Sequence, residues 1–336
     1  MQKMEKVLII ANARRDGGLS GGDNIYLNIH KYFPCETMIW DMLNINFKPF
    51  TLCYIYRIAV ACFTALFWKI DFDTVYSASD FWMDSLPALI LKLRGCKWIA
   101  GFYLFAPKEN RNYYYTQKVA YRIIKWFADI VYITNNSYKD RFADKKTIDI
   151  HGGVDISKCD YKPEAPRIYD AVFIGRIHAT KGIDDLIQAW KYVRAKDAKA
   201  TLAIIGDGDL GIEYIRKRLP DNKFGVTYFG FMGDDRFAIY KSSRCVIYPT
   251  RTHFSMSPVE AMACGCPMIT YHSVVMNELD PRGVIYCTKT SEIAEAIIWN
   301  SHRQAWHEGA ARKWAAGWDW KPRIMSIYFK TKGMIE

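Results

Sequence analysis

The chain has 336 residues, about twice the length typical of one domain, so we expect two domains. Half of its residues are apolar and 24% are charged, a globular composition that excludes a disordered or collagen-like chain. The net charge of +11 is spread along the chain, which fits a phosphate-bearing ligand, an anionic membrane surface or nucleic acid. Because the sequence contains no nucleic-acid-binding motif, we expect no nucleic-acid partner.

The nine cysteines are odd in number, show no CxxC spacing and form no metal-ligand pattern with the seven histidines. They predict neither a disulfide framework nor a zinc site, and they favour a reducing, cytoplasmic compartment. The apolar run before Arg14 is shorter than a secretory signal requires.

Short apolar segments rich in β-branched residues alternate with longer amphipathic ones. We expect strands at residues 7–12, 36–42, 74–79, 97–104 and 130–135, and again at 171–177, 201–206, 226–231, 245–250 and 267–272. Continuous apolar strands separated by helices predict parallel sheets covered on both faces. The polar, proline-containing segment 155–167 divides the two series. The predicted fold class is therefore α/β, with two doubly wound Rossmann-like domains.

Residues 51–68 form an apolar stretch in which Arg57 is the only charge. Three interpretations remain open: a transmembrane helix, a helix buried against the sheet, and a helix that dips one face into a membrane interface. Arg57 and the need for a crossover helix at this position argue against a span. Residues 112–130 mix tyrosines and Trp126 with Lys118, Arg122 and Lys125, which suits a membrane–water boundary or a solvated basic helix face.

Glycine-rich sequence follows the first expected strand. Gly17, Gly18, Gly21 and Gly22 precede a helix, where backbone N–H groups can approach an anion closely. The spacing is not GxGxxG, and a plain flexible turn explains the loop equally well. Asp41, near the end of the second strand, mimics the ribose-binding acid of dinucleotide enzymes.

Charged residues follow two strands in the second half. Arg176 and Lys181 come after the strand that Gly175 ends, where they would neutralise a diphosphate or be ordinary surface charges. Ser257-Pro258-Val259-Glu260 reads as a capping box with proline at the first helical position. Glu260 is then either a helix cap or a carboxylate that accepts hydrogen bonds from ribose hydroxyls, beside a helix N-terminus that would hold phosphate.

Five blocks occur in a fixed order: Gly175-Arg176, Lys181-Gly182, Gly206-Asp207-Gly208, Phe229-Gly230-Phe231 and Glu260-Ala261-Met262-Ala263-Cys264-Gly265-Cys266-Pro267. Together they resemble the retaining GT-B glycosyltransferases of glycosyltransferase family 4 (glycosyl transferases group 1). The resemblance implies a GT-B fold with a cleft between its two domains. It implies an acceptor domain at residues 1–155, a donor domain at 156–317, and a C-terminal helix at 318–336 that crosses back to the first domain.

The resemblance also implies roles for single residues. Arg176 and Lys181 would hold the donor diphosphate and Glu260 the ribose, and these three form the expected catalytic set. The expected donor-binding residues are Gly21, Gly22, Gly175, Met232, Thr252, Met256 and Ser257. Thr252 stands where the family usually has a second glutamate at the donor sugar. Tyr103 stands on the acceptor side, near where the family often has a histidine.

The implied activity is transfer of a sugar from a UDP- or GDP-linked donor to a hydroxyl of a glycan or lipid-linked acceptor, with retention of anomeric configuration. We expect no cofactor and no metal, because the DxD sequences at Asp71 and Asp207 lie in the wrong places for a metal-dependent nucleotide site. The alternatives are a weakly active or inactive GT-B scaffold that acts as a partner protein, and a sugar-nucleotide epimerase of the same fold. A nicotinamide dehydrogenase rests on Asp41 alone. We expect a cytoplasmic protein attached peripherally to an anionic membrane surface on its inner face.

Overall fold

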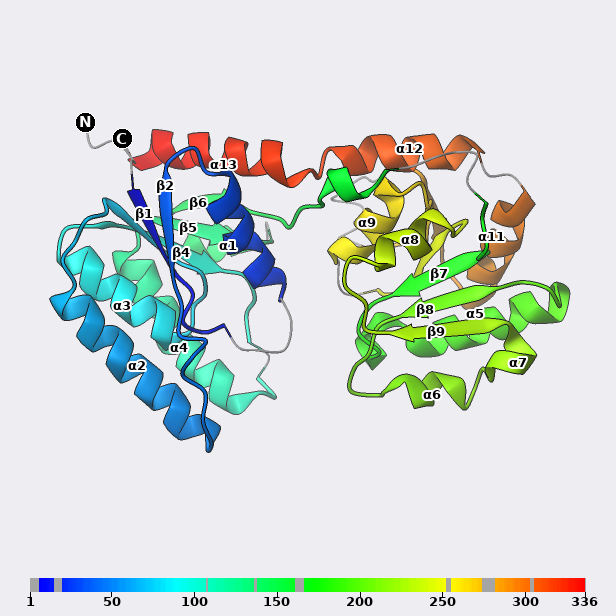
Figure 1. Ribbon diagram of the computed structural model, residues 1–336, viewed down its shortest axis with the longest axis horizontal. Helices are drawn as coiled ribbons and strands as arrows, with labels where there is room; N and C mark the ends of the chain where they lie inside the picture. The colour runs from blue at the N-terminus through cyan, green and yellow to red at the C-terminus, as the bar shows by residue number, and fades with distance from the viewer. Residues whose placement is uncertain are drawn as a thin grey trace. The chain divides into compact units, whose positions relative to one another are not determined.

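The computed structural model describes residues 6–14, 20–106, 108–135, 138–160, 166–251, 255–273, 282–302 and 305–335. The chain divides into two compact units, which we treat one at a time (Figure 1). Unit 1 comprises Met1–Gly153 and Trp320–Glu336, and unit 2 comprises Val154–Asp319. Each unit is built on a six-stranded parallel sheet with helices on both faces, which confirms the predicted α/β fold of two doubly wound domains.

The sheet of unit 1 has the strand order β2-β1-β3-β4-β5-β6. Its strands are β1 (Lys6–Ile10), β2 (Glu36–Trp40), β3 (Thr74–Ser77), β4 (Lys97–Phe102), β5 (Ile130–Ile133) and β6 (Lys146–Asp149). The first five lie within or one residue beyond the predicted segments. The edge strand β6 was not predicted, because its sequence KTID is short and mostly polar and gives no buried-strand pattern.

Helices cover the two faces of this sheet. On one face lie α1 (Gly21–Tyr32) and α13 (Trp320–Ile335), and on the other lie α2 (Phe50–Phe67), α3 (Trp82–Leu93) and α4 (Arg111–Phe127) (Figure 1). Although α13 comes from the far end of the chain, its Trp320 and Ile324 are buried in the same core as Ile25 and Ile29 of α1. The end of the chain is therefore part of the first unit's core.

The sheet of unit 2 has the order β12-β11-β10-β7-β8-β9. Its strands are β7 (Ala171–Ile174), β8 (Leu202–Ile205), β9 (Val226–Gly230), β10 (Val246–Tyr248), β11 (Met268–Tyr271) and β12 (Val284–Cys287). All but β12 lie within the predicted segments. The order runs outward from β7 on one side and from β10 on the other, so it reverses between these two strands. In open parallel sheets ligands bind at the carboxyl ends of the strands at such a reversal.

The helices of unit 2 also form two layers. One face is covered by α5 (Ile183–Lys196), α6 (Ile212–Arg216) and α11 (Thr290–His302), and the other by α8 (Arg236–Lys241), α9 (Met256–Ala263) and α12 (Ala305–Ala316). Short segments complete the unit: α7 (Asp221–Phe224) and the 3₁₀ turns η3 (Ile156–Lys158) and η4 (Ala179–Lys181), while unit 1 has η2 (Asp140–Phe142). Trp190 of α5 is fully buried and donates its indole N–H to the carbonyl of Phe224.

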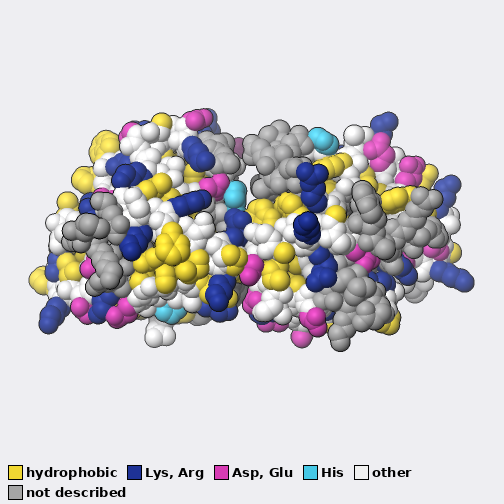
Figure 2. All heavy atoms as spheres, turned by 90° about the horizontal axis from the view of Figure 1, so that it is seen from above, with side chains coloured by type: hydrophobic (Ala, Val, Ile, Leu, Met, Phe, Trp, Pro, Cys, Tyr) yellow, Lys and Arg dark blue, Asp and Glu magenta, His cyan; other side chains and the backbone are white. Residues whose placement is uncertain are grey.

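Surface charge and cysteines agree with the sequence pattern. All nine cysteines are unpaired thiols, and seven of them are buried. On the face drawn in Figure 2, Lys and Arg side chains are scattered over the surface and do not gather into a single patch. The charge excess is therefore diffuse on this face, as the even distribution along the sequence predicts.

The apolar stretch at residues 51–68 forms α2. Among the described residues it is the one helix long and apolar enough to cross a membrane, and only 22% of it is buried. A helix buried against the sheet is therefore the wrong interpretation, because α2 packs beside α3 through a narrow stripe and leaves its large side chains exposed.

Buried polar groups fasten the loop that follows β1. Asp84 of α3 is almost fully buried and accepts hydrogen bonds from the Ala13 amide, at 3.1 Å, and from the Ser79 hydroxyl. The guanidinium of Arg57 donates to the carbonyls of Asn12 and Arg14, at 3.2 and 3.0 Å. Burial raises the pKa of Asp84 to about 8, although the hydrogen bonds from Ser79 and Ala13 act in the opposite direction.

The raised pKa of Asp84 predicts that the protein loses stability as the pH rises from 5 to 8. Over this range the folded state still holds a proton that the unfolded carboxyl released near pH 4, so folding requires an increasingly scarce proton. Asp84→Asn mimics the protonated acid. In this variant the contribution of Asp84 to the slope of unfolding free energy against pH, on the order of 1 kcal/mol per pH unit, should disappear. Chemical denaturation at several pH values measures it.

Asp71→Asn is the matched control. The hydrogen bond from Lys6 lowers the pKa of Asp71, so this group titrates below pH 5 and its loss should leave the slope between pH 5 and 8 unchanged. An Asp84→Asn protein with the wild-type slope would show that Asp84 is ionised in the folded state.

Candidate functional site

The loop after β7 carries the two expected diphosphate-binding cations. Arg176 lies on the surface two residues after β7 ends, and Lys181 closes the 3₁₀ turn η4. Gly182 then starts α5 with a φ of 69°, a left-handed conformation that side chains rarely adopt. A Cβ atom at Gly182 would lie 1.9 Å from the carbonyl oxygen of Pro249, so only glycine lets this loop meet the one after β10.

Arg176 and Lys181 are close enough to repel each other. Burial lowers the pKa of Lys181, and the positive charge of Arg176 lowers it further. The Lys181 ammonium lies 5.8 Å from the centroid of the Tyr248 ring. Within the part of the chain that the structure describes, no acidic side chain forms an ion pair with either cation. Two uncompensated cations therefore sit at the point where the strand order reverses, and an anion bound there would relieve their repulsion.

The loop after β8 packs directly against the loop after β7. Gly206 has a φ of 132°, and a Cβ atom there would lie 2.0 Å from the carbonyl oxygen of Gly175. The amide of Ile177 donates to the carbonyl of Asp207 at 3.1 Å. The side chain of Asp207 caps the amide of Gly208, and that of Asp209 lies 3.7 Å from His178. The second DxD sequence is thus used in holding the two loops together.

The first helical turn after β10 differs from the predicted one. α9 begins at Met256, and its N-cap is Ser255, whose side chain makes no capping hydrogen bond. The predicted capping box at Ser257 is therefore wrong: Ser257 and Pro258 lie inside the first turn. The Ser255 side chain does not cap the amides of Met256 and Ser257, which lie at the positive end of the helix dipole, where a bound anion is favoured. Thr252 and its neighbour His253 lie outside the described residues.

Glu260 binds an arginine instead of capping its helix. Nε and Nη2 of Arg236 each donate to one carboxylate oxygen of Glu260, both at 2.8 Å. Both side chains are largely buried. Burial acts to lower the pKa of Arg236, but the hydrogen bonds and negative charge of Glu260 outweigh it and raise the pKa above the ordinary value. The charges continue through Asp234, 3.6 Å from Arg236, to Lys158 at 2.8 Å.

Arg236 is a site residue that the sequence reasoning missed. It follows the F-G-F-M-G-D-D run after β9, where a cation next to two acids looks like a solvated turn. Met232, from the same run, is half-buried and packs with Met256 on the core beneath α9. The loops after β7, β9 and β10 therefore all contribute predicted donor-binding residues at the carboxyl edge of this sheet.

The predicted residues of unit 1 lie at the carboxyl edge of the other sheet. Gly21 and Gly22 are the first residues of α1, and a Cβ atom at Gly22 would lie 3.4 Å from the Tyr103 ring. The Tyr103 hydroxyl is hydrogen-bonded to that of Tyr76, and burial raises the pKa of Tyr103 above its ordinary value. Asp41 accepts a hydrogen bond from the amide of Leu43 in its own turn.

A second carboxylate near this edge was also missed. Asp80 is buried just after β3 and accepts hydrogen bonds from the Gln117 amide group at 2.9 Å and the Tyr113 hydroxyl at 3.5 Å. Phe81 stacks on the Tyr113 ring, with centroids 5.2 Å apart. Burial raises the pKa of Asp80 to about 6. The short polar run S-A-S-D after a buried strand is the signal that could have identified it.

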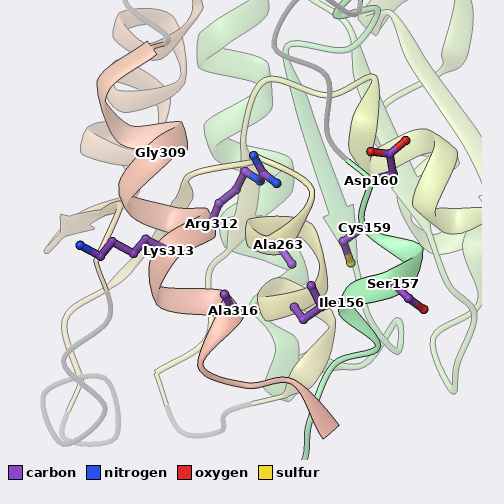
Figure 3. Close-up of a pocket in the computed structure, with 9 residues that line it drawn as sticks. All are labelled: Ile156, Ser157, Cys159, Asp160, Ala263, Gly309, Arg312, Lys313 and Ala316. Carbon is purple, nitrogen blue, oxygen red and sulfur yellow. The ribbon is translucent and has the colours of Figure 1, made fainter. Parts of the chain in front are cut away.

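Unit 2 also has a surface hollow of about 680 Å³ beside α12 (Figure 3). Its lining includes Cys159, Ala263, Arg312 and Lys313, and Arg312 extends toward the hollow while Lys313 extends away from it. None of the predicted site residues lines this hollow. The first DxD sequence lies at the opposite end of its strand from the carboxyl edge, because Asp71 and Asp73 precede β3 and bind Lys6.

Comparison with known proteins agrees with this geometry. Residues 169–300 match the family model for glycosyl transferases group 1. An uncharacterized glycosyltransferase of Methanocaldococcus jannaschii is 24% identical over 298 residues, covering 76% of this chain and 74% of that protein.

Two solved structures are similar in fold. Sucrose-phosphate synthase of Thermosynechococcus elongatus has a TM-score of 0.69 at 16% identity, covering 98% of this chain and 99% of that one. The pneumococcal O-GlcNAc transferase in complex with UDP and GlcNAc has a TM-score of 0.60 at 14% identity, covering 78% of this chain and 57% of that one. Its two parallel sheets share the fold of these structures, and residues 169–300 match glycosyl transferases group 1, so the chain is a glycosyltransferase of GT-B fold.

Proposed function

We propose that this glycosyltransferase is a retaining enzyme of family 4 that uses a UDP- or GDP-linked sugar and transfers the sugar to an acceptor hydroxyl. The observation that carries the proposal is the pair of mutually repelling cations, Arg176 and Lys181, at the strand-order reversal of unit 2. A nucleoside diphosphate supplies the negative charge that this pair lacks. The similar pneumococcal enzyme, which was solved with UDP, supports this choice of ligand class.

Each group of the donor has a counterpart in unit 2. Arg176 and Lys181 bind the diphosphate, and the uncapped amides of Met256 and Ser257 donate to the same phosphates. Glu260 accepts hydrogen bonds from the ribose hydroxyls, while Arg236 holds its carboxylate in place. Backbone near Met232 faces the nucleobase. Gly175 lets the diphosphate approach the backbone, Gly21 and Gly22 bind the donor from unit 1, and Thr252 binds the sugar.

Charge stabilisation drives the chemical step. As the bond between the anomeric carbon and the diphosphate oxygen breaks, its electron pair moves to the diphosphate. Arg176, Lys181 and the N-terminus of α9 stabilise this growing negative charge. The acceptor oxygen attacks the same face of the sugar, and the leaving phosphate takes its proton. This sequence accounts for retention without a dedicated base.

The acceptor is a glycan or a lipid-linked molecule, and unit 1 binds it. Tyr103 marks the acceptor side after β4, and Asp80 with the stacked Phe81 and Tyr113 offers a carboxylate and an aromatic surface for sugar rings. The protein works in the cytoplasm, consistent with nine unpaired thiols.

Arg176→Ala and Lys181→Ala should each lower turnover by roughly 100-fold or more, the scale of losing one preorganised charge contact to the transition state. Release of free nucleoside diphosphate from a panel of donor sugars measures this turnover. Lys217→Ala, an exposed cation just after α6, is the control and should leave turnover unchanged. Wild-type turnover in folded Arg176→Ala and Lys181→Ala proteins would contradict the diphosphate assignment.

Glu260→Gln should weaken nucleotide binding by about 1–3 kcal/mol, because charge-assisted hydrogen bonds to ribose become neutral ones. Arg236→Gln breaks the same ion pair but keeps the carboxylate, so it should lower the melting temperature and reduce nucleotide affinity less. Calorimetric titration and thermal melts on the same samples separate the two effects. If both variants lose only melting temperature, the ion pair is purely structural.

Chelation should leave activity intact, because cationic side chains and helix amides neutralise the diphosphate. Within the described residues no group of three His, Cys, Asp or Glu side chains is placed to hold a metal ion. Activity is measured before and after EDTA treatment and after return of manganese. Loss with EDTA and recovery with manganese would show that a metal replaces part of the proposed role of Arg176 and Lys181.

A further inference from the structure

The helix α2 exposes its large apolar side chains and buries small or charged ones, which is the reverse of an ordinary surface helix. Its buried stripe consists of Cys53, Arg57, Ala61 and Ala65, which are small or charged. Large apolar side chains point to solvent, and among them Phe63 is 66% and Phe67 is 72% exposed. Leaving such side chains in water is unfavourable relative to burying them. A helix that only covered a sheet would place these residues inward.

The charge in α2 faces the protein and not the solvent. The Arg57 guanidinium is 4% exposed and binds the carbonyls of Ile45, Asn12 and Arg14. These hydrogen bonds hold α2 against the rest of unit 1. They also leave its outward surface without any charged side chain, so Arg57, which argued against a membrane span in the sequence, does not lie on the outward side of α2.

The apolar surface continues over the neighbouring helices. α2, α3 and α4 lie side by side on one face of the sheet (Figure 1). On α4 the outward positions Tyr115, Val119, Arg122 and Trp126 follow helical spacing, and Trp126 is 69% exposed. We call this surface the outer apolar face. Its exposed apolar residues are Leu52, Ile55, Tyr56, Phe63, Leu66, Phe67, Leu93, Tyr115, Val119, Trp126 and Phe127.

The charged side chains that α2, α3 and α4 expose are all basic. Neither α2 nor α4 contains an acidic residue, and the single acid of α3, Asp84, is buried. Lys125 pairs with Asp144 and Lys92 with Asp129, whereas Lys118 and Arg122 are exposed and form no ion pair with a described residue. A second copy of the chain would bring like charges together and supply no acid to meet them. An anionic lipid surface supplies both the apolar layer and the negative charge.

We propose that the outer apolar face of α2, α3 and α4 binds the surface of an anionic lipid bilayer, with α2 lying in the interface and not spanning it. Phe63, Phe67 and Trp126 insert among the lipids, and Lys118 and Arg122 contact their headgroups. The sequence predicts only that the protein attaches to a membrane. The proposal names the surface and the residues that make the attachment.

Flotation with vesicles tests the proposal and requires neither donor nor acceptor, so its outcome is independent of the proposed reaction. The full chain should float with vesicles of phosphatidylcholine and phosphatidylglycerol at low salt, less at high salt, and little with phosphatidylcholine alone. Lys118→Glu with Arg122→Glu should weaken binding by about 25-fold or more, since each of the two lost cations contributes about fivefold near an anionic leaflet and the new glutamates repel it. Phe63→Asn with Phe67→Asn should abolish binding even at low salt.

Two control variants carry the same kinds of substitution on other surfaces. Lys191→Glu with Lys196→Glu makes the same charge reversal on α5 of unit 2, and Phe329→Asn removes an aromatic that is 61% exposed on α13, across the sheet from α2. Both should bind vesicles like the wild type, and melts should show that all variants fold. The proposal is overturned if wild-type protein does not float with anionic vesicles, or if the controls lose binding equally. A different result would assign the outer apolar face to self-association. In that case the wild-type protein does not bind vesicles but sediments as a dimer, and Phe63→Asn with Phe67→Asn makes it a monomer.

Discussion

The candidate site depends on the close approach of three loops at the carboxyl edge of the second sheet. Strand order reverses between β7 and β10, so the connections from these strands leave in opposite directions and expose the strand ends between them. Backbone-to-backbone contact holds the loops there: Gly182 meets Pro249, and Gly206 meets Gly175, at separations that leave no room for a Cβ atom. The cations Arg176 and Lys181 lie at this junction, where they repel each other and a bound anion would relieve the repulsion.

Each unit buries two ionisable side chains near its candidate site residues. Those of unit 1 bind backbone groups, whereas those of unit 2 bind each other. In unit 1, Asp84 and Arg57 are buried against backbone groups and anchor the loop after β1. In unit 2, Arg236 and Glu260 form a two-point ion pair that continues to Asp234 and Lys158. The first arrangement orders a loop through hydrogen bonds between buried side chains and backbone groups. The second holds the Glu260 carboxylate in a fixed orientation on α9, and the proposed binding of ribose depends on this preorganisation.

Placement of charge also explains the unusual surface of α2. Because Arg57 turns inward to satisfy carbonyls of the loops around residues 12, 14 and 45, the side of α2 opposite to it is purely apolar. The basic residues that accompany this surface come from α4, two helices away. The proposed membrane-binding surface is therefore assembled from separate segments of the chain, and neither helix alone is both apolar on its outward side and basic.

Local sequence was sufficient to predict the two parallel α/β units, because the buried strands are continuous runs rich in β-branched residues and polar or amphipathic segments separate them. The order of motifs likewise placed Arg176, Lys181 and Glu260 after the correct strands. The edge strands β6 and β12 were missed, because they are short and only partly buried and their pairing depends on a neighbouring strand. Tertiary structure alone decided that Glu260 pairs with Arg236, that α9 begins at Met256, and that Arg57 faces inward. Each of these depends on which distant groups meet a side chain in space, and residue spacing along the chain does not contain that information.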